Sequence, residues 1–188
     1  MRKQDYYYFM LTMSDDEINA TFNYNVEYII QNQIDEDVLR WALQREGQYL
    51  LADDEIFVRY PGYNYYYGSN YGRVISIAGK EPKFLKQSKH NRYDGYTFVE
   101  PDKPRLRILV GRMVADIFCP NFYREKGRKY VDVHHIDHDK TNNCWRNLVL
   151  LPDHLHDVVH RTDKKCGIMQ PFVVCVSPLL DGDLDPNE

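Results

Sequence analysis

The arrangement of histidines between positions 134 and 160 constrains this chain more than any other feature. His134 and His135 are adjacent, and His156 and His160 follow at a spacing of four residues. Neighbouring residues in a β-strand point to opposite faces, so His134 and His135 are expected to serve different purposes. Residues four apart share one face of a helix, which would bring His156 and His160 together. Two imidazoles on a helix that closes onto a histidine from a preceding hairpin predict a site for one divalent cation.

The sequence around these histidines predicts the order strand, loop, strand, helix. A strand is expected over residues 130–136, and residues 137–143 are polar and form turns. The short apolar segment 148–151 predicts a return strand. Asp153 is a suitable N-cap for a helix over residues 154–161.

Helical signals also occur before this region. Ser14 and Glu17 have the spacing of a capping box, which predicts a helix beginning there. A second helix is expected over residues 35–45, and Gly47 would end it. Apolar residues recur at helical spacing over residues 108–118 and predict a third helix.

Charge is strongly segregated along the chain, although the net charge is only −4. Residues 1–55 carry 4 Lys/Arg and 12 Asp/Glu, whereas residues 56–165 carry 20 Lys/Arg and 12 Asp/Glu. A basic body suits a polyanionic partner, and a solvated surface explains it equally well. No apolar run has the length of a membrane span, and the start lacks the apolar region of a signal peptide. The four cysteines form no C-x-x-C pair, so we expect reduced thiols in a cytoplasmic protein.

The motif His134-His135-Ile136-Asp137, followed by Asn142-Asn143, Asn147-Leu148 and His156-x-x-x-His160, resembles the HNH endonucleases. The intervals agree, with 12 residues from His135 to Asn147 and 9 from Asn147 to His156. Upstream, Tyr60-Pro61-Gly62-Tyr63 and the segment 67–76 resemble the small DNA-binding module found beside HNH cores in phage and intron homing endonucleases. Residues 112–121 resemble the helix that precedes the HNH strand in that subgroup. The resemblance covers roughly residues 55–162.

Three positions depart from the pattern of the homing subgroup. His134 stands where Asp is frequent, His156 stands where Asn is frequent, and Gly111 stands where a basic residue or histidine usually begins the helix. Histidine at both of the first two positions is closer to the bacterial toxin DNases, in which three histidines bind one metal ion.

The resemblance implies an α+β fold with a ββα-metal (HNH, His-Me finger) core. A small β-rich DNA-binding module would precede this core, and an N-terminal helical extension would precede the module. The expected segments are a partly helical acidic extension (1–54), the β-rich module (55–104), the nuclease core with its leading helix (105–165) and an acidic tail (166–188).

By the same resemblance, the protein is expected to hydrolyse DNA phosphodiester bonds in the cytoplasm of a bacterial or phage-infected cell. His135 would be the general base, and Asn147 would orient it or brace the loop. His134, His156 and His160 would bind one divalent ion, which stabilises the scissile phosphate and the leaving 3′ oxygen. Mg²⁺, Mn²⁺, Zn²⁺ and Ni²⁺ are candidates, and three imidazoles favour Mn²⁺, Zn²⁺ or Ni²⁺ over Mg²⁺.

Other polar residues have expected roles of their own. His138 and His154 are expected at the surface, with a phosphate contact as the alternative for His138, and Asn142 and Asn143 are expected to shape the loop. Contacts to DNA phosphates are expected from basic side chains, namely Arg73, Lys83, Lys86, Lys89, Arg92, Arg105, Arg107, Arg112, Lys126, Arg128 and Lys129.

Two alternative functions follow from the same residues. One is a DNA-binding protein whose HNH core is inert, although His135 and Asn147 are both intact. The other is a defence or toxin nuclease in which the acidic segment 1–54 inhibits the core or binds a protein partner.

Overall fold

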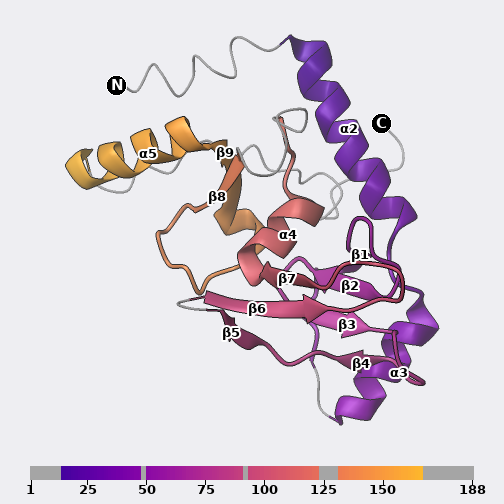
Figure 1. The fold of residues 1–188 in the computed structure, drawn as a ribbon. Coiled ribbons are helices and arrows are strands. Elements are labelled where there is room, and N and C mark those ends of the chain that lie inside the picture. Colours follow the sequence, from indigo (N-terminus) through magenta and orange to yellow (C-terminus); the bar gives the residue numbers. More distant parts are fainter. Residues whose placement is uncertain (1–13, 48–49, 91–92, 123–130, 167–188) are drawn as a thin grey trace.

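The computed structural model describes residues 14–47, 50–90, 93–122 and 131–166 (Figure 1). Within these residues, four α-helices and nine short strands in three antiparallel sheets form an α+β fold, which confirms the predicted class. None of the helices that the structure describes is long and apolar enough to cross a membrane. The predicted tail lies outside the described residues, apart from its first position.

The two N-terminal helices begin where the sequence predicts, and the second also ends at the predicted glycine. Helix α2 (Asp15–Gln31) starts with a complete capping box, in which the Ser14 hydroxyl accepts from the Glu17 backbone N–H at 3.2 Å. The Glu17 carboxylate accepts in return from the Ser14 backbone N–H at 2.9 Å. Helix α3 (Glu36–Glu46) ends at Gly47, whose φ of 75° is the left-handed conformation that glycine adopts without a steric penalty.

The β-rich region contains two small sheets that pack through aromatic side chains. The Tyr66 ring stacks on the Phe98 ring with centroids 4.2 Å apart, and Tyr60 meets the same ring edge-on at 5.4 Å. These tyrosines therefore pack in the interior. The first sheet has the order β1 (Phe57–Arg59), β2 (Tyr66–Ser69), β3 (Val74–Ser76) and β4 (Lys83–Phe84), and the second has β5 (Ser88–His90), β6 (Tyr93–Phe98) and β7 (Leu106–Leu109).

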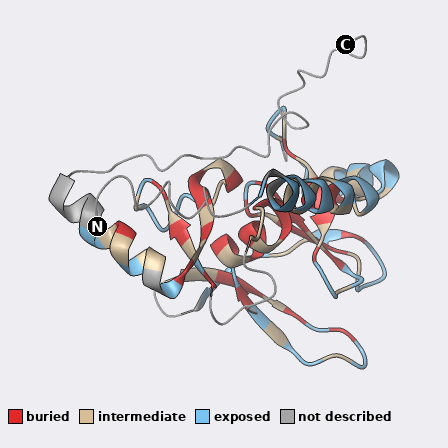
Figure 2. Cartoon of the chain, turned by 90° about the horizontal axis from the view of Figure 1, so that it is seen from above, coloured by how far each residue is buried: buried red, intermediate tan, exposed pale blue. Residues whose placement is uncertain are grey.

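Helix α4 (Val110–Phe118) lies at the centre of the molecule (Figure 1) and contacts strands of all three sheets. Its buried residues, with those of the strands around it, make up most of the main core (Figure 2). The helix begins two residues later than predicted, because Ile108 pairs with Tyr96 and extends strand β7. Pairing with β6 thus overrides the helical periodicity of this short segment.

The segment that carries the histidines forms the predicted ββα unit. Strand β8 (Val131–His135) pairs antiparallel with β9 (Leu148–Pro152), and the short 3₁₀ helix η3 (Trp145–Asn147) leads into β9. Helix α5 (Asp153–Cys166) follows directly and extends beyond the predicted end at residue 161. The order strand, loop, strand, helix is confirmed.

The N-terminal helices pack into this body. The buried Asn25 side chain donates to the Phe118 carbonyl at the end of α4, at 3.1 Å. The Tyr28 hydroxyl donates to the Arg59 carbonyl in β1 at 2.9 Å. Ala42 of α3 is fully buried in a second apolar cluster with side chains of β1 and β3. The expected boundary between residues 54 and 55 is therefore crossed by buried contacts.

Candidate metal centre

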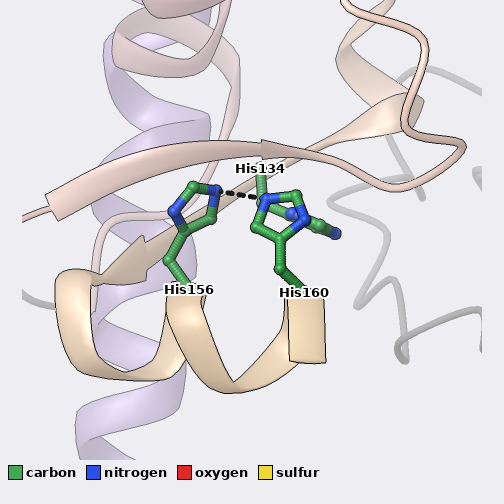
Figure 3. A group of neighbouring side chains, drawn as sticks. All are labelled: His134, His156 and His160. Carbon is green, nitrogen blue, oxygen red and sulfur yellow. Dashed lines mark hydrogen bonds between the residues drawn. The ribbon is translucent and has the colours of Figure 1, made fainter. Parts of the chain in front are cut away.

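The three predicted metal ligands meet on one side of the ββα unit (Figure 3). His134 projects from β8, and His156 and His160 project from adjacent turns of α5. One ring nitrogen from each lies within 4.8 Å of the others, and the Nε2 atoms of His156 and His160 are 3.1 Å apart. The His134 side chain is fully buried at 1% exposure, whereas the other two are half-buried. The hairpin and the helix thus bring together the donors that the spacing predicts.

The cluster fits a transition-metal ion. Imidazole nitrogens bind Zn²⁺ at about 2.0–2.1 Å, so two nitrogens on one tetrahedral ion lie roughly 3.3–3.4 Å apart. The observed 3.1 Å between His156 and His160 is already close to this value. All three donors are nitrogens, which suit Zn²⁺, Ni²⁺ or Mn²⁺ better than Mg²⁺, an ion that prefers oxygen.

Asp132 supports this cluster from behind. Its Oδ2 lies 3.3 Å from Nδ1 of His156, which directs the other ring nitrogen, Nε2, toward His160. Carboxylates in this position fix the orientation of a metal-binding imidazole and raise its basicity. The sequence carried a signal for this contact, because Asp132 and His134 are two apart and share a face of β8.

His135 faces away from the three-histidine cluster, as the strand geometry predicts. Its Nε2 lies 3.0 Å from Oδ1 of Asn143, whose amide nitrogen donates to the Thr141 carbonyl at 3.2 Å. Asn143 was expected only to shape the loop, but the structure gives it a direct contact with the predicted base. Gly111 makes space for the pair, since a Cβ atom there would lie 2.7 Å from Asn143 Oδ1 and 3.2 Å from His135 Nε2.

Asn147 braces the loop that connects the two strands. Its Oδ1 accepts from the Asp137 backbone N–H at 3.0 Å, and its Nδ2 donates to Asp137 Oδ1 and to the Asn142 carbonyl, each at 2.8 Å. Asn147 was predicted either to orient His135 or to brace the loop, and these bonds correspond to bracing of the loop. Burial opposes ionisation of Asp137, but hydrogen bonds from Asn142, Asn147 and the Asp139 backbone, with His135 nearby, hold its pKa below the ordinary value.

A cleft of about 490 Å³ is bordered by His156 and His160 of the cluster and by His135. It is lined by residues of the second sheet, of α4, of the β8–β9 loop and of α5. Tyr93 and Lys140 meet at its rim, with the Lys140 ammonium 2.9 Å from the Tyr93 hydroxyl and 5.1 Å from the ring centroid. Arg107 also lines the cleft. The second sheet and the histidine region thus form one concave surface with cationic side chains.

His138 lies in this cleft and is half-buried, although a surface position was expected. Its ring centroid is 5.3 Å from that of His134 and 5.1 Å from that of His160. The contact arises because the loop folds back over the cluster, which residue spacing alone does not indicate. The side chain of His154, the other histidine expected at the surface, lies outside the described part of the structure.

The predicted DNA-contacting residues divide into three groups. Arg73 and Arg112 have internal partners: Arg73 pairs with the buried Glu55, and Arg112 with Asp116 at 2.8 Å and with the Val131 carbonyl. These contacts hold both guanidinium groups against the fold, and Arg112 also lines the cleft. A phosphate contact from either residue stays a prediction. The exposed group is Lys83, Lys86, Lys89, Arg105 and Arg107. The group outside the described residues is Arg92, Lys126, Arg128 and Lys129.

A family model and a solved structure are each similar to part of this chain. The model of the NUMOD4 motif, which is found in homing endonucleases, matches residues 55–100. This match supports the resemblance to HNH endonucleases and coincides with most of the expected module. A solved structure of the HNH homing endonuclease I-HmuI, which describes DNA binding and cleavage, is similar with a TM-score of 0.47 and 25% identity over 60% of each chain. No curated protein matches the chain.

Proposed function

We propose that this protein is a metal-dependent HNH endonuclease that hydrolyses phosphodiester bonds in DNA. The observation that carries the proposal is the division of the adjacent pair His134 and His135. His134 joins a cluster of three nitrogen donors, and His135 borders the cleft on the other face of the same strand. Hydrolysis of a phosphodiester requires both a cation and a base beside one phosphate, and this strand supplies a candidate for each.

In this proposal the cation is held by His134, His156 and His160, and when bound it neutralises charge on the scissile phosphate and the leaving 3′ oxygen. His135 accepts the proton from the attacking water, for which a neutral imidazole with an ordinary pKa of about 6.5 is suited. Asn143 holds the His135 ring in position through its 3.0 Å contact. Asn147 keeps the loop folded around both groups, and Asp132 orients His156.

The proposed substrate is DNA, and the cationic side of the cleft supports this assignment. Arg107 and Lys140 line the cleft and would contact phosphates next to the scissile one. The exposed side chains of Lys83, Lys86 and Lys89 add positive charge within the NUMOD4-matched region, and Arg105 follows shortly after it. We propose that residues 55–104 hold the duplex and residues 105–165 cut it, in the cytoplasm of a bacterial or phage-infected cell.

Plasmid cleavage with purified variants tests the proposal. Wild-type protein should nick or linearise supercoiled DNA in the presence of Mn²⁺, Zn²⁺, Ni²⁺ or Mg²⁺, and chelation should abolish cutting. His135→Ala should lose cleavage but bind the cation as the wild type does, because its ring faces away from the cluster. His156→Ala should lose both cleavage and cation binding. If wild-type protein binds DNA but no divalent ion supports cleavage, and His135→Ala behaves as the wild type does, the inert DNA-binding alternative holds instead. If wild-type protein cleaves DNA and His135→Ala cleaves it equally well, His135 is not the base.

A further inference from the structure

The backbone of His138, a residue that lines the cleft, has an unusual conformation. Its φ is 62°, and among the described residues other than glycine only Asp102 shares a positive φ. Glycine adopts this left-handed region freely, whereas a side chain there meets its own backbone. A strained residue of this kind persists when the surrounding structure or the function of the site requires its side chain. The conformation of His138 therefore indicates a role for its imidazole.

The His138 ring stands as close to the cluster as the cluster members stand to each other. Its centroid is 5.3 Å from His134 and 5.1 Å from His160. The three predicted ligands are separated by 4.5 to 5.5 Å when measured the same way. His138 meets both neighbours at an interplanar angle of 87°, so its ring is roughly perpendicular to each of theirs.

We propose that His138 is a fourth imidazole donor to the cation held by His134, His156 and His160. This inference rests on the proposed metal-dependent function and deepens it. The ring approaches from the β8–β9 loop, which lies on the cleft side, whereas the other donors come from β8 and α5. The ring nitrogens that lie within 4.8 Å of one another belong to His134, His156 and His160, so His138 would join them by rotation of its side chain.

The chemistry of four imidazoles specifies the class of ion. A set of four neutral nitrogen donors favours the binding of Zn²⁺, Co²⁺ or Ni²⁺ over that of Mg²⁺ or Ca²⁺, which prefer oxygen ligands. Four protein donors do not exclude a phosphate oxygen, because zinc sites can expand to five ligands. His138 would thus act as a residue that determines affinity and metal specificity, in addition to the three ligands predicted from the sequence.

Replacement of His138 by glycine tests this role without straining the fold. Glycine accepts a φ of 62°, so His138→Gly removes the imidazole and relaxes the backbone at once. Asp102→Gly is the matched control, since it makes the same backbone change at a φ of 62° in the turn between β6 and β7. Both variants should melt, without metal, at or above the wild-type temperature.

The readouts are Zn²⁺ affinity by competition with a chromophoric chelator and the visible absorption spectrum of the Co²⁺-loaded protein. His138→Gly should bind Zn²⁺ at least about tenfold more weakly, since loss of even an indirect partner of a metal ligand reduces affinity 10- to 100-fold. Its Co²⁺ absorption bands should shift, whereas Asp102→Gly should match the wild type in both measurements.

The outcomes separate this inference from the proposed function. If wild-type protein binds metal and cleaves DNA while His138→Gly has the same Zn²⁺ affinity and Co²⁺ spectrum, the role of His138 is refuted and the nuclease stands. If wild-type protein binds neither Zn²⁺ nor Co²⁺ but cleaves DNA with Mg²⁺ or Mn²⁺, the four-imidazole site is refuted and the nuclease stands. If it binds no divalent ion and cleaves DNA with none, both are refuted. If Asp102→Gly weakens binding as much as His138→Gly does, the effect belongs to the backbone and the inference is overturned.

Discussion

The substitution Gly111→Ala should uncouple catalysis from metal binding. A Cβ atom at this position would lie 2.7 Å from Asn143 Oδ1, whereas ordinary contacts begin at 3.4 Å, so Asn143 would have to retreat by about 0.7 Å. The Asn143 amide is the end of a flexible side chain and will move before the backbone does. A shift of this size is sufficient to break its 3.0 Å bond to His135, because hydrogen bonds do not persist beyond about 3.5 Å.

We expect the rate of plasmid cleavage to fall roughly 10- to 100-fold, the range expected when a reacting group is misplaced by about 1 Å. Stability should not fall, because alanine favours a helix over glycine by up to about 1 kcal/mol. Zn²⁺ affinity should stay at the wild-type value, since Gly111 does not touch the three-histidine cluster. The matched control is Gly79→Ala, where an added Cβ would meet only Glu81 O at 3.9 Å. Wild-type cleavage by Gly111→Ala would refute the assignment of Asn143 as the residue that positions the base.

Three further predictions address stability and the metal centre. Arg73→Ala should lower the free energy of unfolding in urea by about 3 kcal/mol or more, because it leaves the carboxylate of Glu55, 2% exposed, without its cation; a loss below about 1 kcal/mol would contradict this. Asp132→Asn should weaken Zn²⁺ binding about tenfold in calorimetric titration through the loss of the carboxylate behind His156, and unchanged affinity would refute that role. The lowered pKa of Asp137 stabilises the fold above its ordinary pKa of 3.8, and this contribution should disappear as the pH falls through the folded-state pKa. Urea midpoints measured from about pH 5 to about pH 2 should show this loss, and Asp137→Asn should reduce it.

Local sequence signals predicted the elements of this fold with good accuracy. The capping residues Ser14 and Glu17 and the terminal Gly47 act within one turn of the chain, so their effect does not depend on distant packing. The three-histidine cluster was predictable for a related reason. A helix places residues four apart on one face. Because β9 pairs with β8 and α5 follows β9 directly, α5 lies close to β8 and its histidines reach His134.

Contacts made through the folding of loops and the pairing of distant strands were not predictable in this way. Asn143 reaches His135 only because the loop curls back over the start of α4, where Gly111 leaves space. Arg73 was predicted to contact DNA phosphate because it is basic, and the sequence did not indicate that folding pairs it with Glu55, 18 residues away. His138 reaches the cluster through a left-handed backbone conformation that no sequence pattern required. In each case a contact outside the regular geometry of one helix or one strand determines the surroundings of the residue.

The packing of the N-terminal helices also changes how regulation by this segment must be tested. Phe22, Val26 and Ile29 of α2 contribute to the same apolar core as α4 and the β8–β9 hairpin. Deletion of residues 1–54 would expose this core and remove the Asn25 bond to the end of α4, so altered activity in the truncated protein would report loss of folding as well as loss of inhibition. A partner-binding or inhibitory role is better tested on the exposed face, for example with Trp41→Ala, whose side chain is 52% exposed on α3. Because that residue lies outside the shared core, an effect on cleavage at unchanged melting temperature would have to come from the surface of the N-terminal segment.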